Sequence, residues 1–228
     1  PHKARIALRR FRTLLAAFRP HIDSDLAERL HKRARTHFRA IGVIRDADVL
    51  ASHDTSHPLL RSPSAEPQRQ RKRIRKQLDH DHAHKLRELV EEAFADKSWR
   101  RTGAQHRSFL NRPIADVAAT ALDEAWNDVQ AHGPDLNAMS PRESHDLRKD
   151  LKNLRYLTEA FNPCWPGADP EPALSLVRQL QDELGLLNDL EVARKEGVAN
   201  QSDAVRATNL SQAENLLTQL RTTPLWWA

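Results

Sequence analysis

The feature that most constrains the fold of this chain is an internal repeat with an offset of 143 residues. Adding 143 carries His2 to His145, and the same register holds as far as Val49 and Val192. Of the 49 pairs from 2 to 50, 13 are identical, whereas chance would give about 3 to 4 in a chain so rich in Ala, Leu and Arg. We therefore expect two related halves that repeat the same arrangement of elements.

Each copy of the repeat predicts two helices joined at a proline. The first helix of each copy ends just before Pro20 or Pro163, because proline disfavours a helical residue in front of it. Hydrophobic periodicity predicts the remaining helices. The expected helices are 2–19, 23–51, 66–98, 113–131, 142–162, 170–196 and 203–220. Only 6 glycines occur among 228 residues, which also favours an all-α fold.

The repeat also predicts the domain organisation. We expect a single domain over 1–228, with two four-helix-bundle-like halves at 1–100 and 113–228 related by pseudo-two-fold symmetry. The helix at 113–131 precedes the second copy, and subtracting 143 places its counterpart before the first residue. We therefore expect the first half to lack its leading helix in this chain, with further residues upstream.

The first helix of each copy carries an apolar stripe beside a basic stripe. The apolar stripes have the spacing of a helix packed in a bundle. They comprise Ala4, Leu8, Phe11, Leu15 and Phe18 in the first copy, and Leu147, Leu151, Leu154 and Phe161 in the second. The basic stripes lie about 100° around the helix. They comprise His2, Arg5, Arg9, Arg12 and Arg19 in the first copy, and His145, Arg148, Lys152 and Arg155 in the second.

The charge of these stripes indicates an anionic ligand. The chain has a net charge of +5, and residues 1–19 contain seven basic or histidine side chains and no carboxylate. Like charges one helical turn apart repel by a few tenths of a kcal/mol per pair, so a binding role best explains their recurrence in both copies. Regular spacing suits a linear polyanion better than a compact metabolite. No metal, cofactor or catalytic step is expected.

These residues resemble the CHAD domain, the conserved histidine α-helical domain family. The resemblance is carried by "HKARIALRRFRTLLAAF" and "IGVIRDADV" in the first half, and by "HDLRKDLKNLRYLTEAF" and "LQDELGLLNDLEV" in the second. It implies two four-helix bundles related by pseudo-two-fold symmetry. It also implies binding of inorganic polyphosphate, without catalysis, in a basic central groove or pore lined by the motif helices. A cytoplasmic protein associated with polyphosphate granules is expected.

The resemblance assigns roles to residues of this chain. The expected polyphosphate-binding residues are His2, Arg5, Arg9, Arg12, His145, Arg148, Lys152 and Arg155. Secondary contacts are expected from Arg10, Lys149, Arg35, Arg178 and Tyr156, although Tyr156 is equally compatible with a packed aromatic. Asp46 and Asp189 either orient the arginines or form hydrogen bonds within their own helix. Gly42 and Gly185 are expected to allow close helix packing.

Three other functions are compatible with parts of the sequence. A nucleic-acid-binding helical protein would use the same stripes for phosphate contacts, although no interleaved aromatics are present for base stacking. An accessory or targeting module for a polyphosphate or triphosphate enzyme would use the same binding face. A scaffold could use "PLWWA" at the C-terminus, although tryptophans more often cap a core.

An enzyme or a membrane protein is less compatible with the sequence. "HDHAH" at 80–84 has metal-like spacing but no glutamate in the HExxH position, so solvated histidines are expected there. The single Cys164 excludes an intramolecular disulfide and favours a reducing compartment. No apolar run approaches the roughly 20 residues needed to span a bilayer.

Overall fold

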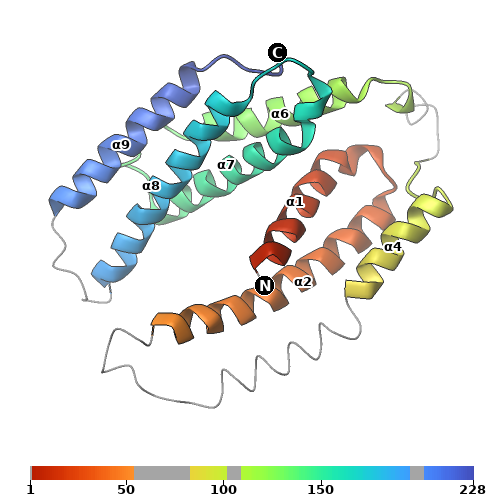
Figure 1. The fold of residues 1–228 in the computed structure, drawn as a ribbon, viewed down its shortest axis with the longest axis horizontal. Helices are drawn as coiled ribbons and strands as arrows, with labels where there is room; N and C mark the ends of the chain where they lie inside the picture. Colours follow the sequence, from red (N-terminus) through yellow and green to blue (C-terminus); the bar gives the residue numbers. More distant parts are fainter. Residues whose placement is uncertain (1, 54–82, 102–108, 196–202) are drawn as a thin grey trace. The chain divides into compact units, whose positions relative to one another are not determined.

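The computed structural model describes residues 2–53, 83–101, 109–195 and 203–228, and the chain divides into two compact units (Figure 1). The first unit is Pro1–Asn111 and the second is Arg112–Ala228. The described residues form seven α-helices and no strand, apart from an isolated bridge between Ile22 and Arg100. The predicted all-α fold is confirmed.

The first unit is built on one long helix. Helix α2 (Ser24–His53) packs against α1 (His2–Phe18) and against α4 (Ala83–Ala95). One cluster of four buried residues joins these helices, and partly buried apolar side chains pack around it. These residues are Leu15, Leu26, Leu30 and Ala93, surrounded by Phe11, Ile22, Leu86, Leu89, Val90 and Trp99.

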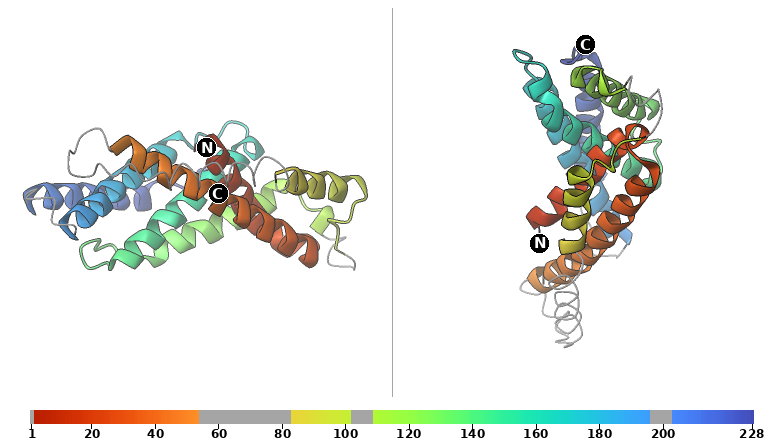
Figure 2. Two further views of the ribbon diagram at one scale, coloured as in Figure 1. Left: turned by 90° about the horizontal axis from the view of Figure 1, so that it is seen from below. Right: turned by 90° about the vertical axis from the view of Figure 1, so that its right-hand side faces the viewer.

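The second unit contains four helices that pack in sequence order. Helix α6 (Ile114–Ala131) packs on α7 (Pro141–Phe161), α7 on α8 (Glu171–Lys195), and α8 on α9 (Asp203–Thr222). Figure 2 shows α8 and α9 side by side in both views. The largest fully buried side chains of this unit come from all four helices. They are Leu122, Val129, Leu147, Leu151, Val177, Leu180, Leu184 and Leu217.

Both motif helices end in the predicted way at a proline. Helix α1 is followed by a 3₁₀ turn at Arg19–His21, and α7 by a 3₁₀ turn at Asn162–Cys164. Each turn contains the proline, Pro20 or Pro163, whose ring fixes φ and which has no N–H for an α-helical hydrogen bond. The prediction from sequence was correct to within one residue at both ends.

Helix α4 ends three residues earlier than its sequence predicted. The expected helix ran to residue 98, but Lys97 has a φ of 60°, in the left-handed region that terminates helices. The Ser98 N–H then donates to Asp96 Oδ1 at 2.8 Å, and the Asp23 N–H donates to the Trp99 carbonyl at 2.9 Å. Residues 66–82 of the expected helix lie outside the described residues.

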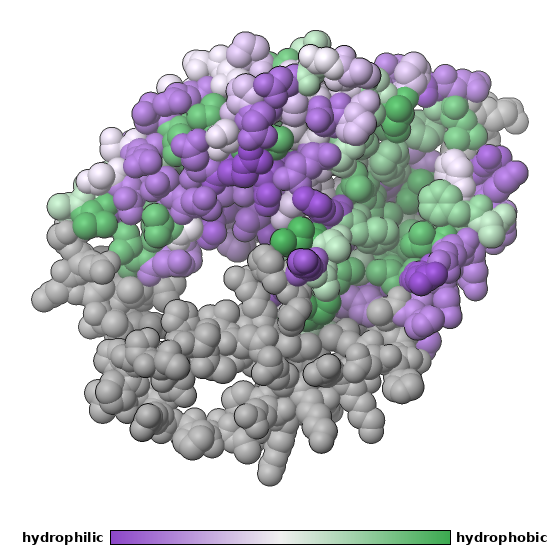
Figure 3. All heavy atoms as spheres, viewed as in Figure 1, coloured by the Kyte–Doolittle hydropathy of each residue, from purple (hydrophilic) through white to green (hydrophobic). Residues whose placement is uncertain are grey.

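The two predicted apolar stripes are buried to different degrees. In α7, Leu147 and Leu151 are fully buried, because α7 lies between α6 and α8. In α1, Leu15 is buried while Ala4 is exposed, and the main helix contact of α1 is with α2. Hydrophobic side chains accordingly show on the face of the first unit over α1 and α4 (Figure 3).

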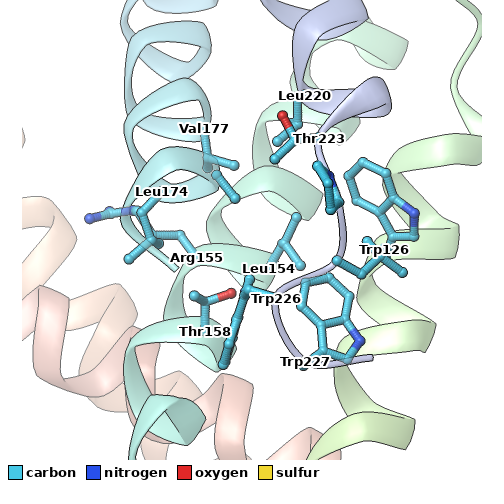
Figure 4. A pocket seen from close by; sticks show the side chains of 13 residues that line it. Trp126, Leu154, Arg155, Thr158, Leu174, Val177, Leu220, Thr223, Trp226 and Trp227 are labelled. Atoms are coloured by element: carbon cyan, nitrogen blue, oxygen red, sulfur yellow. The ribbon is translucent and has the colours of Figure 1, made fainter. Parts of the chain in front are cut away.

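The C-terminal tryptophans close one end of the second unit. Trp227 is 5% exposed, and its Nε1 donates to Asp123 Oδ1 at 2.9 Å. Trp226 packs edge-on against Trp165, with their ring centroids 5.3 Å apart. Figure 4 shows the cavity beside these rings, whose volume of about 20 Å³ has room for about one water molecule. Core capping is therefore confirmed as the structural role of Trp227.

The start of α7 is fixed by a capping box. The Glu143 N–H donates to Ser140 Oγ at 3.2 Å, and the Ser140 N–H donates to Glu143 Oε2 at 2.7 Å. The hydrogen bonds from Ser140 lower the pKa of Glu143. Two backbone donors at the helix start are thereby satisfied, which fixes where α7 begins.

We expect Ser140→Ala to lower the free energy of unfolding by about 1 kcal/mol, because an N-cap hydrogen bond is lost. Urea denaturation followed by circular dichroism measures this change. Ser211→Ala, at an exposed position of α9, is the matched control and should cause no loss, since alanine is the better helix former. An equal effect of the two substitutions would show that the cap contributes nothing.

Candidate functional site

Three arginines of α1 converge on one aromatic ring of α2. The Cζ atoms of Arg5, Arg9 and Arg12 lie 4.9, 5.2 and 5.5 Å from the centroid of the Phe38 ring. Each distance is within the range of a cation–π interaction, worth about 0.5–1 kcal/mol at an exposed site. The ring therefore offsets the mutual repulsion expected for cations one turn apart.

A glycine in α2 makes room for the first of these arginines. A Cβ atom at Gly42 would lie 3.2 Å from Nη1 of Arg5, and one at Gly185 in α8 would lie 3.3 Å from Nη2 of Arg148. The two contacts are related by the offset of 143. Among the described residues, the neighbours of such a Cβ within 4 Å are atoms of the two guanidinium groups, so the close approach that each glycine allows is that of an arginine side chain.

The surroundings of Arg12 are unfavourable for its positive charge. Burial lowers the pKa of Arg12, and the nearby Arg35 and Arg39 lower it further. Its Nε is buried and has no hydrogen-bond partner among the residues that the structure describes. A bound anion would supply both the opposite charge and the missing acceptor.

The row on α7 has different neighbours. Nη1 of Arg155 donates to Glu159 Oε1 at 3.2 Å, and Nη2 lies 3.4 Å from the Tyr156 hydroxyl, with Cζ 4.8 Å from the Tyr156 ring centroid. In Figure 4 the guanidinium of Arg155 points away from the tryptophan rings while its aliphatic part lines the cavity. Arg148 and Arg155 each have a buried Nε without a partner in the described part of the chain.

Tyr156 lies beneath Arg155 and is 5% exposed. Of the two interpretations of Tyr156, this position favours the packed aromatic over a direct phosphate contact. Its ring and hydroxyl hold the Arg155 guanidinium in place, so its contribution to a site would be made through that arginine.

The remaining predicted residues are spread over both units. Arg10 and His145 are exposed, Lys149 donates to Asp146 at 2.5 Å, and Arg178 donates to Glu171. Asp189 is exposed and accepts a hydrogen bond from Asn188 at 3.3 Å. This local bond favours the helix-internal role of Asp189 over an orienting one. The side chains of His2 and Asp46 lie outside the described residues, and a groove shared by both rows stays a prediction.

Sequence reasoning missed Phe38, Arg39 and Glu159. Phe38 and Arg39 were overlooked because recurrence in both copies was the criterion, and their counterparts are Gln181 and Asp182. Helical spacing could have predicted that Phe38 lies near the site, since it precedes Gly42 by four residues and so shares its face of α2. Glu159 likewise follows Arg155 by four residues, the spacing of an ion pair within a helix.

The described residues contain neither a candidate metal site nor a candidate membrane span. Within that part of the chain, no group of three or more His, Cys, Asp or Glu side chains could hold a metal ion. His84 is exposed and its Nδ1 lies 3.7 Å from Glu88 Oε1, while His80 and His82 are outside the described residues. None of the described helices has the length and apolar character needed to cross a membrane.

These features define a class of all-helical proteins in which long helices present rows of cations. The sequence profile of the CHAD domain family matches residues 1–196, and the chain belongs to this family. Comparison with curated proteins and with solved structures found no match.

We expect Gly185→Ala to raise the free energy of unfolding by up to about 1 kcal/mol, because alanine is favoured over glycine inside a helix. The new Cβ would meet only the flexible end of Arg148, which is able to shift. Gly42→Ala, beside Arg5, is the matched variant in the first unit. Urea denaturation measures both, and a loss of stability would show that the glycines serve backbone packing instead.

Proposed function

We propose that this protein binds inorganic polyphosphate through two rows of cations. The α1 row is His2, Arg5, Arg9 and Arg12, and the α7 row is His145, Arg148, Lys152 and Arg155. The observation that carries the proposal is the convergence of three guanidinium groups on Phe38, one of which belongs to the half-buried and partly unsatisfied Arg12. Such an arrangement is unfavourable by itself and becomes favourable when an anion is bound.

The spacing of the rows supports an extended ligand. Arg5 and Arg12 are seven residues apart, which places them about 10 Å apart along the helix axis. A chain that carries a charge on every repeating unit contacts all members of such a row at once. Guanidinium groups also donate two parallel hydrogen bonds to phosphate oxygens, so arginine rows suit phosphate better than a single point charge would.

We infer binding without hydrolysis. Guanidinium groups remain protonated and have no acceptor, so they hold phosphate but serve neither as a nucleophile nor as a base. CHAD domains are generally accessory modules without catalytic activity of their own. A role as the polyphosphate-binding or targeting module beside a phosphate-processing enzyme is compatible with this inference.

Nucleic acid is a less favourable ligand for the α1 row. Binding of single strands depends on aromatic rings available for base stacking. In the first unit Phe38 has three guanidinium groups within 5.5 Å of its centroid, so the ring already has its partners. Phosphate contacts remain available to any polyanion, and competition between ligands distinguishes them.

The triple variant Arg148→Ala, Lys152→Ala, Arg155→Ala should weaken polyphosphate binding at least tenfold and reduce the slope of log Kd against log salt, since fewer counterions are displaced. Titration at several salt concentrations measures both quantities, and circular dichroism checks that helicity is retained. Arg33→Ala, Arg112→Ala, Arg206→Ala removes the same charge from exposed positions outside both rows. Equal losses in the two triple variants would contradict a role for the α7 row.

Duplex DNA at equal phosphate concentration should displace less than half of bound long-chain polyphosphate, because a rigid duplex does not bring successive phosphates to one row of guanidinium groups. Fluorescence competition with labelled polyphosphate measures the displacement, with free orthophosphate as a second competitor. Complete displacement by DNA would establish a general polyanion binder and would remove the claim of polyphosphate preference.

A further inference from the structure

The two rows differ in the carboxylates around them. In the second unit, Glu159 follows Arg155 by one helical turn and pairs with it at 3.2 Å. Subtracting 143 from these positions gives Ala16 and Arg12, and Ala16 is exposed. Arg12 therefore has no carboxylate at the position from which Glu159 pairs with the corresponding cation of the α7 row.

A second difference concerns the helix that follows each row. Arg178 of α8 pairs with Glu171. Their counterparts in the first unit are Arg35 and Glu28, but Glu28 pairs with Arg19 at 3.1 Å. The counterpart of Arg19 is Asn162, which has no charge and cannot form an ion pair with Glu171. The ion pair between Arg19 and Glu28 is therefore particular to the first unit. Arg35 consequently has no ion pair among the residues that the structure describes.

A third difference lies at the residues next to the ring. Phe38 and Arg39 correspond to Gln181 and Asp182 in α8. Arg39 adds to the positive field at Arg12, whereas an aspartate in the equivalent place has the opposite charge. At these described positions, all three differences make the surroundings of Arg12 and Arg35 more positive than those of Arg155 and Arg178.

We propose that the two rows have unequal affinities, and that the α1 row, together with Phe38, Arg35 and Arg39 of α2, forms the tighter phosphate contact. The α7 row is then the weaker contact, because Glu159 and Glu171 compete with phosphate for Arg155 and Arg178. This inference rests on the proposed polyphosphate-binding function.

The difference in affinity between the two rows follows from the contacts that a phosphate must replace in each unit. At Arg155 it must take the place of a carboxylate that already accepts a hydrogen bond. An unsatisfied Nε is common to Arg12 and Arg155, but the charge of Arg12 is opposed by burial and by two neighbouring arginines. A phosphate oxygen there satisfies a donor that has no other acceptor among the described residues, and hydrogen bonds between charged groups are among the stronger ones.

The decisive variant is Ala16→Glu in the full chain, with Ala16→Gln as its control. The introduced carboxylate would stand in the same relation to Arg12 as Glu159 does to Arg155, four residues later on the same helix. Both substitutions introduce good helix formers at an exposed position, so the fold should be retained. We expect Ala16→Glu to weaken binding of long-chain polyphosphate about tenfold relative to Ala16→Gln.

The reciprocal variant is Glu159→Gln, which removes the competing carboxylate from the α7 row. It should strengthen polyphosphate binding by about two- to fivefold, because Arg155 no longer has to release an ion pair. This variant increases affinity, so misfolding could not imitate the expected result. Circular dichroism confirms helicity for all three variants.

The possible outcomes separate this inference from the function on which it rests. Failure of the unaltered protein to bind polyphosphate would overturn both. If the unaltered protein binds but Ala16→Glu and Ala16→Gln have equal affinity, the function stands and the inequality of the rows is refuted. An unchanged or weakened affinity in Glu159→Gln would also refute it, since Glu159 would then not be competing with the ligand.

Discussion

The arginines of α1 repel one another, and the contacts that α2 makes with them reduce the cost of this repulsion. Arg5, Arg9 and Arg12 lie on one face of one helix, where like charges one turn apart destabilise it. The facing helix contributes a ring, Phe38, close to all three guanidinium groups, and a missing side chain at Gly42 that leaves space for Arg5. The Phe38 ring and the space at Gly42 thus help to hold these cations in place.

The second unit meets the same constraint with different partners. Arg148 occupies the space at Gly185, as Arg5 does at Gly42, but Arg155 rests on its own neighbour Tyr156 and pairs with Glu159. Each glycine leaves space for a guanidinium group beside its helix, although glycine inside a helix is about 1 kcal/mol less favourable than alanine. Both units have a glycine at this position despite the loss of helix stability. We infer that the position of the arginine matters more than this loss.

The sequence predicted the elements of the fold better than the contacts of the site. Periodicity and proline positions located the helices, because these signals lie within one segment of chain. Phe38 could not be found in this way, since its role arises from contact between α1 and α2 and its counterpart is Gln181. The end of α4 was missed because Lys97 adopts a left-handed conformation that is unusual for a residue other than glycine. Comparison of the two copies identified residues that recur in both halves. It did not identify residues such as Phe38, which occur in one half only.

Partial burial determines how the rows respond to their surroundings. Salt screens charges that are surrounded by water, whereas charges that are partly buried are screened much less. Arg12 is half-buried beside Arg35 and Arg39, and burial is the largest cause of its lowered pKa. Diffuse counterions therefore relieve this cluster only in part, and a ligand whose oxygens reach Nε and the guanidinium plane relieves it more fully. In the proposed function, the same burial that makes the charge of Arg12 unfavourable in the free protein would favour an anion that enters the row over one that remains in the surrounding solvent.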